Sequence, residues 1–181
     1  MKHALLLVII PSLLSLGSRP AVAQPANNNF ANAYVVSGTT VATNGNSNNA
    51  NRESGEPWIL GDSLQAGGRS VWFAWTAPVS ALTQINTTNS SFNTLLGVYT
   101  GTAVSALSLV ASNDNVTGQN YTSAVQFQAV QGTTYRIVID GRSNFGTNPR
   151  SGNYNLNIRV LAAVAIASPA NNTVFATGTS I

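Results

Sequence analysis

Hydrophobic and polar residues alternate with a period of two along most of the chain from Gln24 onward. The alternation is clearest in four segments, 71–76, 125–129, 135–139 and 154–160. A period of two places successive side chains on opposite faces of an extended backbone, so each segment predicts a half-buried β-strand. No window of ten or more residues has apolar positions at the spacing of an amphipathic helix. The pattern therefore predicts an all-β protein.

Four further strands are expected, at Ala33–Val36, Leu82–Asn86, Thr94–Tyr99 and Leu107–Ala111. About eight short strands, separated by turn-forming residues and with no helices to cover a parallel sheet, predict an antiparallel β-sandwich of jelly-roll type. The segment Asn44–Asn51 holds five asparagines in eight residues and no large apolar side chain. It is expected to be an exposed loop.

The first 23 residues have the features of an export signal. Lys2 and His3 precede an apolar run from Ala4 to Leu16, and Ala21–Ala23 offers a small-x-small cleavage site. The apolar run is shorter than the ~20 residues of a membrane-spanning helix. Cleavage is expected before Gln24, which predicts a secreted or cell-surface protein with no membrane insertion after the signal is removed.

Loss of residues 1–23 changes the chemistry available to the chain. Of 181 residues it leaves 158, with six arginines against five acidic residues and no Lys, His, Cys or Met. So small an excess of basic residues does not predict the basic patch of a nucleic-acid binder. It also excludes a Ser-His-Asp triad, a thiol nucleophile, disulfides and a Cys/His zinc site.

The chain is expected to divide into three parts. Residues 1–23 form the signal and residues 24–161 form the sandwich domain. Residues 162–181 are too few to bury a core of their own. They are expected to be a linker and the incomplete start of an immunoglobulin-like domain, similar to the way bacterial repeats of that type begin.

Six segments in the expected sandwich carry a recognisable combination of motifs. They are 29–33 (NFANA), 53–57 (ESGEP), 70–78 (SVWFAWTAP), 91–101 (SFNTLLGVYTG), 110–115 (VASNDN) and 135–141 (YRIVIDG). In this order they resemble the pre-peptidase C-terminal (PPC) domain family, a β-sandwich appended to exported bacterial hydrolases and surface proteins. The resemblance implies a non-catalytic accessory domain, which in some relatives is stabilised by calcium and in some binds an extracellular polymer.

An oxygen-rich set of residues is the candidate calcium site. Its members are Glu53, Glu56, Asn93, Asn113, Asp114 and Asn115. Calcium takes six to eight oxygen ligands, and these residues supply them if their loops meet at one end of the sandwich. Similar sequences commonly have Asp where this chain has Asn93 and Asn115, so two anionic ligands are missing. Alternatively, Asp114 caps a tight turn and the glutamates are solvated loop charges.

Aromatic side chains give a second candidate site. Trp58, Trp72 and Tyr121 could provide a stacking platform for a sugar ring or a peptide. Trp72 and Trp75 lie on opposite faces of one strand because their separation is odd, so we expect Trp75 in the core and Trp72 on the outer face. Alternatively, all the tryptophans pack beneath loops, as large aromatics usually do.

These observations predict a non-catalytic extracellular accessory module for adhesion or substrate targeting within a larger secreted or surface protein. Its expected partners are an extracellular polysaccharide or protein and other domains of the same chain. One alternative is a structural spacer without a ligand. Another is a carboxylate-dependent hydrolase that uses Glu53, Glu56 or Asp114, which requires two carboxylates about 5 to 9.5 Å apart in a cleft. Asp140, before Gly141, is expected in a hairpin turn.

Overall fold

The computed structural model describes residues 23–61, 67–116, 121–143 and 148–161. Within these ranges the chain forms nine strands and two short 3-10 helices. In chain order they are η1 (Phe30–Asn32), β1 (Tyr34–Val36), β2 (Thr40–Asn46), β3 (Val71–Thr76), β4 (Ala81–Asn86), β5 (Thr94–Thr100), η2 (Val104–Ala106), β6 (Ser108–Asn113), β7 (Ala124–Ala129), β8 (Thr134–Gly141) and β9 (Asn153–Val160). No helix among them is long and apolar enough to cross a membrane.

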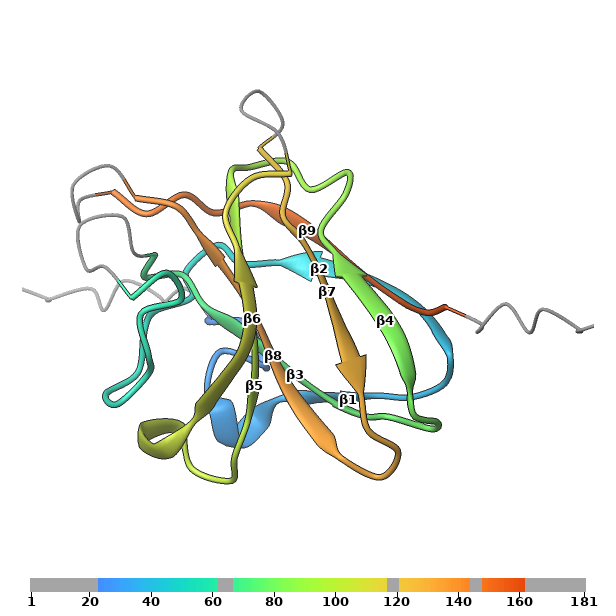
Figure 1. Cartoon of the computed structure of the whole chain (residues 1–181). Coiled ribbons are helices and arrows are strands. Elements are labelled where there is room, and N and C mark those ends of the chain that lie inside the picture. Colours follow the sequence, from blue (N-terminus) through green and yellow to red (C-terminus); the bar gives the residue numbers. More distant parts are fainter. Residues whose placement is uncertain (1–22, 62–66, 117–120, 144–147, 162–181) are drawn as a thin grey trace, which may run out of the picture.

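The strands form two sheets that pack face to face, as Figure 1 shows. Sheet A has the order β1-β3-β8-β5-β6, and sheet B has the order β2-β9-β4-β7. Neighbouring strands are antiparallel except for β1 and β3. The predicted all-β sandwich is therefore confirmed, whereas the jelly-roll connectivity stays a prediction.

The main core lies between the two sheets. Val71, Phe73 and Trp75 point inward from β3, and Leu156 and Ile158 point inward from β9. Each of these side chains is almost inaccessible to solvent. The period-two pattern thus identified the inward faces correctly, because alternate positions of a strand share one face.

A second apolar layer covers the outer face of sheet A. Trp72, Leu95 and Val138 point outward from the sheet and pack beneath Phe30 and Ile59. The ring centroids of Phe30 and Trp72 are 5.3 Å apart in an edge-to-face arrangement. Strand β3 is therefore buried on both faces. Trp72 lies on the outer face, as predicted, but it is covered there, so the prediction that it offers an exposed stacking surface is wrong.

Strand β2 occupies part of the segment expected to be a loop. Asn44 and Asn46 pair with Asn155 and Asn153 of β9, at the edge of sheet B. Between them, Gly45 lies against Tyr154, whose hydroxyl would be 2.3 Å from an added Cβ atom. The tyrosine ring takes the space that an apolar side chain would fill, which explains why this strand lacks an apolar alternation at this point.

The ends of the chain lie largely outside the described residues. Of the expected export signal only Ala23 is described, and the expected linker at 162–181 is not. The last described backbone bonds tie the end of β9 to its neighbours: Val160 donates to the carbonyl of Thr39, and Leu161 donates to that of Leu82.

Candidate binding pocket at the loop end

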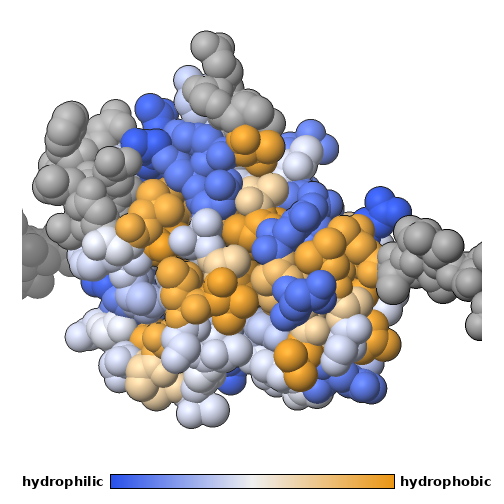
Figure 2. Space-filling view, in the orientation of Figure 1, coloured by the Kyte–Doolittle hydropathy of each residue, from blue (hydrophilic) through white to orange (hydrophobic). Residues whose placement is uncertain are grey.

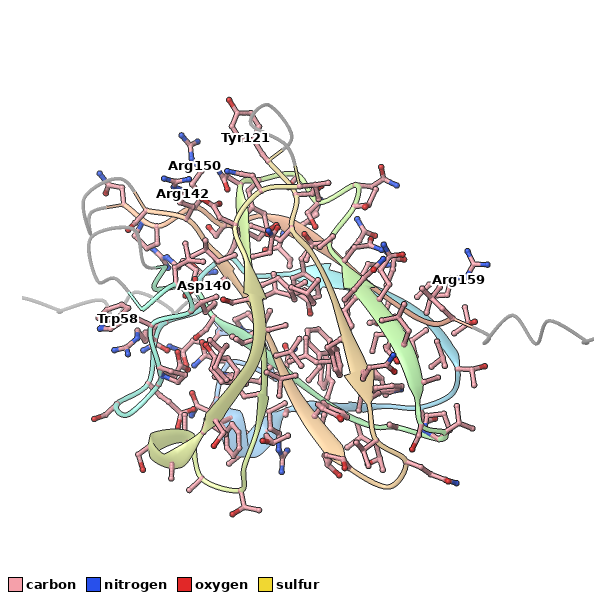
Figure 3. All side chains as sticks on the ribbon, in the orientation of Figure 1. Trp58, Tyr121, Asp140, Arg142, Arg150 and Arg159 are labelled. Atoms are coloured by element: carbon pink, nitrogen blue, oxygen red, sulfur yellow. The ribbon has the colours of Figure 1, made fainter. Side chains whose placement is uncertain are left out.

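A pocket of about 510 Å³ opens at one end of the sandwich. Its described lining comes from three segments that are distant in sequence. The lining residues are Ser90, Ser91, Phe92, Asn93, Tyr121, Arg142 and Arg150. Figure 3 shows Tyr121, Arg142 and Arg150 together at this end of the molecule, and Figure 2 shows hydrophilic residues gathered there, above apolar patches over the middle of the sandwich.

Backbone hydrogen bonds connect the three segments of the lining. Arg142 donates its N–H to the carbonyl of Asn93, and Arg150 donates its N–H to the carbonyl of Arg142. Thr94 donates to the carbonyl of Tyr121. These bonds place both arginines beside the loop that carries Asn93.

Gly141 allows the two arginines to lie on adjacent backbone segments. A Cβ atom at this position would lie 1.6 Å from the carbonyl oxygen of Arg150. The segment that carries Arg150 can therefore approach the end of β8 only because residue 141 has no side chain.

A cluster of buried hydroxyl groups lies behind the pocket. The Oγ1 atoms of Thr87 and Thr94 are 2.7 Å apart, and Thr94 Oγ1 is 3.0 Å from Ser123 Oγ. The backbone N–H of Ser123 donates to Thr87 Oγ1 at 2.8 Å. Because all three side chains are fully buried, these bonds join the loop before β5 to the segment that follows Tyr121.

The pocket carries positive charge. Arg142 forms an ion pair with Asp114, so its charge is partly balanced. Arg150 is exposed, and Tyr121 exposes 64% of its surface. Among the described lining residues there are two arginines and no carboxylate. This arrangement favours an anionic group on a ligand.

The predicted calcium ligands do not form one group. Asn93, Asn113, Asp114 and Asn115 belong to the loop end, near the start of β5 and the end of β6. Glu53 instead accepts a hydrogen bond from the N–H of Phe30, beside η1. In the described part of the chain, Glu53, Glu56 and Asp114 do not form a carboxylate cluster that could hold a metal ion.

The residues at the loop end bring oxygens but few charges, so a calcium site there stays a prediction. The Oδ1 atoms of Asn93, Asp114 and Asn115 are buried and have no hydrogen-bond partner among the described residues. They bring only one carboxylate, however, and Arg142 pairs with its other oxygen. Burial raises the pKa of Asp114, and this effect exceeds the opposing effect of Arg142. With one carboxylate among them, these residues offer fewer anionic ligands than calcium sites commonly have.

Glu56 has a different environment from the one expected for a loop charge. It is buried against sheet A, where its carboxylate accepts hydrogen bonds from Ser70 Oγ at 2.9 and 3.0 Å and from Trp72 Nε1 at 2.9 Å. Burial raises its pKa, and the hydrogen bonds oppose the shift. The carboxylate therefore serves to hold the 50–60 segment on the sheet.

Asp140 likewise has a structural role. The prediction of a hairpin turn is wrong, because Asp140 lies within β8 and is buried. Its Oδ1 atom accepts hydrogen bonds from the backbone N–H groups of Gly68, Arg69 and Gly141. Sequence alone could not show this, since two of the partners, Gly68 and Arg69, are 72 and 71 residues away.

The three predicted aromatic ligands lie in different places. Trp72 is buried and belongs to the layer outside sheet A. Trp58 exposes 39% of its surface, but the guanidinium of Arg52 lies 3.6 Å above its ring. Only Tyr121 lies at the pocket. The prediction missed Arg142 and Arg150, although they are two of only six arginines after residue 23.

The fold defines an all-β sandwich, and the site is an arginine-bearing pocket at its loop end. No protein-family model and no curated protein matches the chain, so the resemblance to the PPC family stays a prediction. Among solved structures, one similar chain is a periplasmic inhibitor of g-type lysozyme, PliG from Aeromonas hydrophila. The alignment has a TM-score of 0.43 and 12% identity, and covers 71% of this chain and 97% of PliG.

Proposed function

We propose that this protein is an exported, non-catalytic binding module that recognises an acidic extracellular polysaccharide through the pocket at its loop end. The observation that carries the proposal is the combination of Arg150, Arg142 and Tyr121 around one pocket whose described lining holds no carboxylate. Such a module would serve adhesion or substrate targeting within a longer secreted or surface protein. The resemblance to the PPC family supports the same role.

The chemistry of the pocket suits an acidic sugar. A guanidinium can donate two parallel hydrogen bonds to a carboxylate, and this geometry selects planar anions. The ring of Tyr121 offers contact area for a sugar face, and Ser90 and Ser91 offer hydroxyl groups. Pockets of this size hold small ligands or short oligomer segments.

The arrangement of the acids supports a non-catalytic role. Glu53, Glu56 and Asp114 each have a separate partner: the N–H of Phe30, the side chains of Ser70 and Trp72, and Arg142. Glycoside hydrolysis requires two carboxylates on opposite sides of a substrate site. The described pocket lining contains none.

Export and domain organisation complete the proposal. The signal-like residues 1–23 would direct the chain out of the cytoplasm, where its lack of cysteine is compatible with either redox state. Residues 24–161 would form the binding module. Residues 162–181 would be a linker and the incomplete start of an immunoglobulin-like domain.

The proposal can be tested by calorimetric titration of the chain from Gln24 onward with trigalacturonate, a short polymer of acidic sugars. Binding is expected for trigalacturonate, and not for the neutral trisaccharide maltotriose. Arg150→Ala should weaken binding ten- to a hundred-fold, since a hydrogen bond to a charged group contributes about 1.5–3 kcal/mol. Arg150→Lys should restore only part of the affinity, because lysine lacks the planar fork.

Arg159→Ala is the matched control. Arg159 is also an exposed arginine, but Figure 3 shows it on the other side of the molecule from the pocket. Its loss should leave the affinity for trigalacturonate nearly unchanged. Equal losses for Arg150→Ala and Arg159→Ala would indicate a general effect of charge and would contradict a specific pocket. Absence of any binding would favour a spacer.

A further inference from the structure

Trp58 is an exposed aromatic residue on a backbone segment that buried neighbours hold in place. It exposes 39% of its surface, whereas the next residue, Ile59, is buried in the apolar layer outside sheet A. Glu56, two residues before it, is bound to sheet A, and the N–H of Gly61 donates to the carbonyl of Trp58 at 2.9 Å. An exposed ring on a fixed backbone loses little conformational entropy when a ligand stacks on it.

The guanidinium of Arg52 lies against one face of this ring. Its central carbon is 3.6 Å from the ring centroid, and one of its N–H groups donates to the carbonyl of Glu56. A guanidinium has more N–H donors than this bond uses, and stacking leaves the donors at its edge directed outward. Trp58 and Arg52, which we call the platform, therefore combine a stacking surface with a group that can bind an anion.

Arg69 connects the platform to the pocket through a series of contacts. Its Nη1 atom donates to the carbonyl of Ala50, in the segment that carries the platform, at 3.1 Å. On the other side, Gly68 packs against Pro149, in the segment that carries Arg150. A Cβ atom at Gly68 would lie 3.3 Å from Pro149 Cγ.

Asp140 fixes the middle of this route on sheet A. Its Oδ1 atom accepts hydrogen bonds from the N–H of Gly68 at 2.9 Å and from the N–H of Arg69 at 2.7 Å. Asp140 is only 5% exposed, so its carboxylate lies beneath the backbone of these residues. Among the described residues, neither Arg52 nor Arg69 forms an ion pair with a carboxylate, and both are partly exposed.

Four of the six arginines after residue 23 thus follow one route, which we call the arginine track. The track consists of Arg142 and Arg150 at the pocket, then Arg69, and then Arg52 beside Trp58. Figure 3 shows Trp58 on the same side of the molecule as Arg142 and Arg150, whereas Arg159 lies on the opposite side.

We propose that the acidic polysaccharide extends from the pocket along the arginine track, and that Trp58 and Arg52 form a distal subsite for one of its sugar rings. This inference rests on the proposed function and adds the length of polymer that the protein recognises. A polymer of acidic sugars repeats its carboxylate on every ring, so successive rings can bind successive guanidinium groups. The tryptophan ring offers its area to a sugar face at the end of the track. Two linked subsites bind one polymer more tightly than either binds a short oligomer.

The test is calorimetric titration of the chain from Gln24 onward with the trimer and the dodecamer of galacturonate. The trimer tests the pocket, whereas the dodecamer can follow the track. Trp58→Ala and Arg69→Gln should each lower the affinity for the dodecamer about tenfold, the effect of losing one stacking contact or one charged hydrogen bond. Both variants should bind the trimer as the unmodified protein does, because neither residue lines the pocket.

Arg52→Gln tests the platform without changing the ring. Glutamine keeps an N–H donor for the carbonyl of Glu56 and removes the charge, so the affinity for the dodecamer should fall as it does in Trp58→Ala. A dodecamer can place different trimers in the pocket, but this raises its affinity by the same factor in every variant. The comparison between variants therefore isolates the contribution of the track.

Arg159→Gln is the matched control for charge, and it should change neither affinity. If the trimer binds and the track variants keep full affinity for the dodecamer, the polymer ends at the pocket. That result would overturn this inference and leave the proposed function standing. Equal losses for Arg69→Gln and Arg159→Gln would also overturn it, because net charge alone would then explain the binding. If neither oligomer binds, the proposed function fails together with the inference.

Discussion

At the scale of single residues, two acids, Glu56 and Asp140, stabilise local structure in the interior. Glu56 and Asp140 are each only 5% exposed. Trp72 and Ser70 donate to Glu56, and three backbone N–H groups donate to Asp140. Burial is the largest cause of the raised pKa of both groups, and the charge of Asp140 further raises the pKa of Glu56.

These shifts predict that the protein is more stable at mildly acidic pH than at alkaline pH. Above pH 4.5, the usual pKa of glutamate, the folded protein still holds a proton on Glu56 that the unfolded chain has lost. The free energy of unfolding therefore falls as the pH rises through the raised pKa of Glu56. Asp114 and Asp140 act in the same direction, from a usual pKa of 3.8.

Glu56→Gln should reduce this pH dependence. The amide oxygen can accept from Trp72 and the amide N–H can donate to Ser70. We therefore expect the melting temperature of the variant at pH 8 to match or exceed that of the unmodified protein. Glu56→Ala should lose about 1–3 kcal/mol of unfolding free energy at either pH, because it leaves the buried N–H of Trp72 without an acceptor. If Glu56→Gln instead lowers the melting temperature more at pH 8 than at pH 5, the charge of Glu56 stabilises the fold and the prediction is contradicted.

Only part of the pocket lining could be predicted from the sequence. Tyr121 could be proposed because it is an aromatic residue in a polar segment. Arg142 and Arg150 could not be paired with it, because their proximity depends on the absence of a side chain at Gly141 and on the register of β8 with β5. Trp72 was expected to be accessible and is buried, because alternation specifies the two faces of a strand but does not show what covers the outer one.

At the scale of elements, burial explains which strands the sequence predicted well. Strands with one face in the core, such as β7 and β9, have a clear alternation. Strand β2 lies at an edge, has no fully buried residue and contains Gly45, so its pattern resembled a loop. Sheet order was not predictable, because period two identifies strands and not their partners.

The connection between β4 and β5 depends on the buried hydroxyl cluster. Thr94→Val replaces the central hydroxyl with a methyl group of similar size and removes two hydrogen bonds within the cluster. We expect a loss of about 1–2 kcal/mol in unfolding free energy and weaker binding at the pocket, because Ser90 to Asn93 lie on the same connection.

Thr83→Val is the matched control for this substitution. Thr83 is also fully buried in a strand, but its hydroxyl donates to the carbonyl of Ala81 at 3.2 Å and takes no part in the cluster. In denaturant titration, the unfolding free energy of Thr83→Val should be closer to that of the unmodified protein than the unfolding free energy of Thr94→Val is. Equal decreases in unfolding free energy for the two variants would show that the loss of any buried hydroxyl group has this effect, and that the cluster has no special role.

At the scale of the whole molecule, the sandwich depends on packing and hydrogen bonds and has no disulfides. It has two apolar layers, one between the sheets and one outside sheet A, and the chain contains no cysteine. The second layer brings the 50–60 segment and η1 onto sheet A, away from the pocket at the loop end.

This architecture predicts that calcium has little effect on stability. The acids that could hold an ion are distributed among three separate structural roles, and Asp114 is already paired with Arg142. A site that bound calcium with a hundredfold excess of ion over its dissociation constant would add about 2.7 kcal/mol. For a domain of this size, that would raise the melting temperature by roughly 5–10 °C.

We therefore expect melting curves in 1 mM calcium and in excess chelator to have midpoints that differ by less than about 1 °C, well below that shift. Magnesium at the same concentration controls for ionic strength. If calcium alone raises the midpoint by several degrees, the prediction is contradicted, and Asp114→Asn then locates the ion. Loss of the calcium effect in that variant would place the ion at the loop end, whereas its persistence would place the ion elsewhere in the chain.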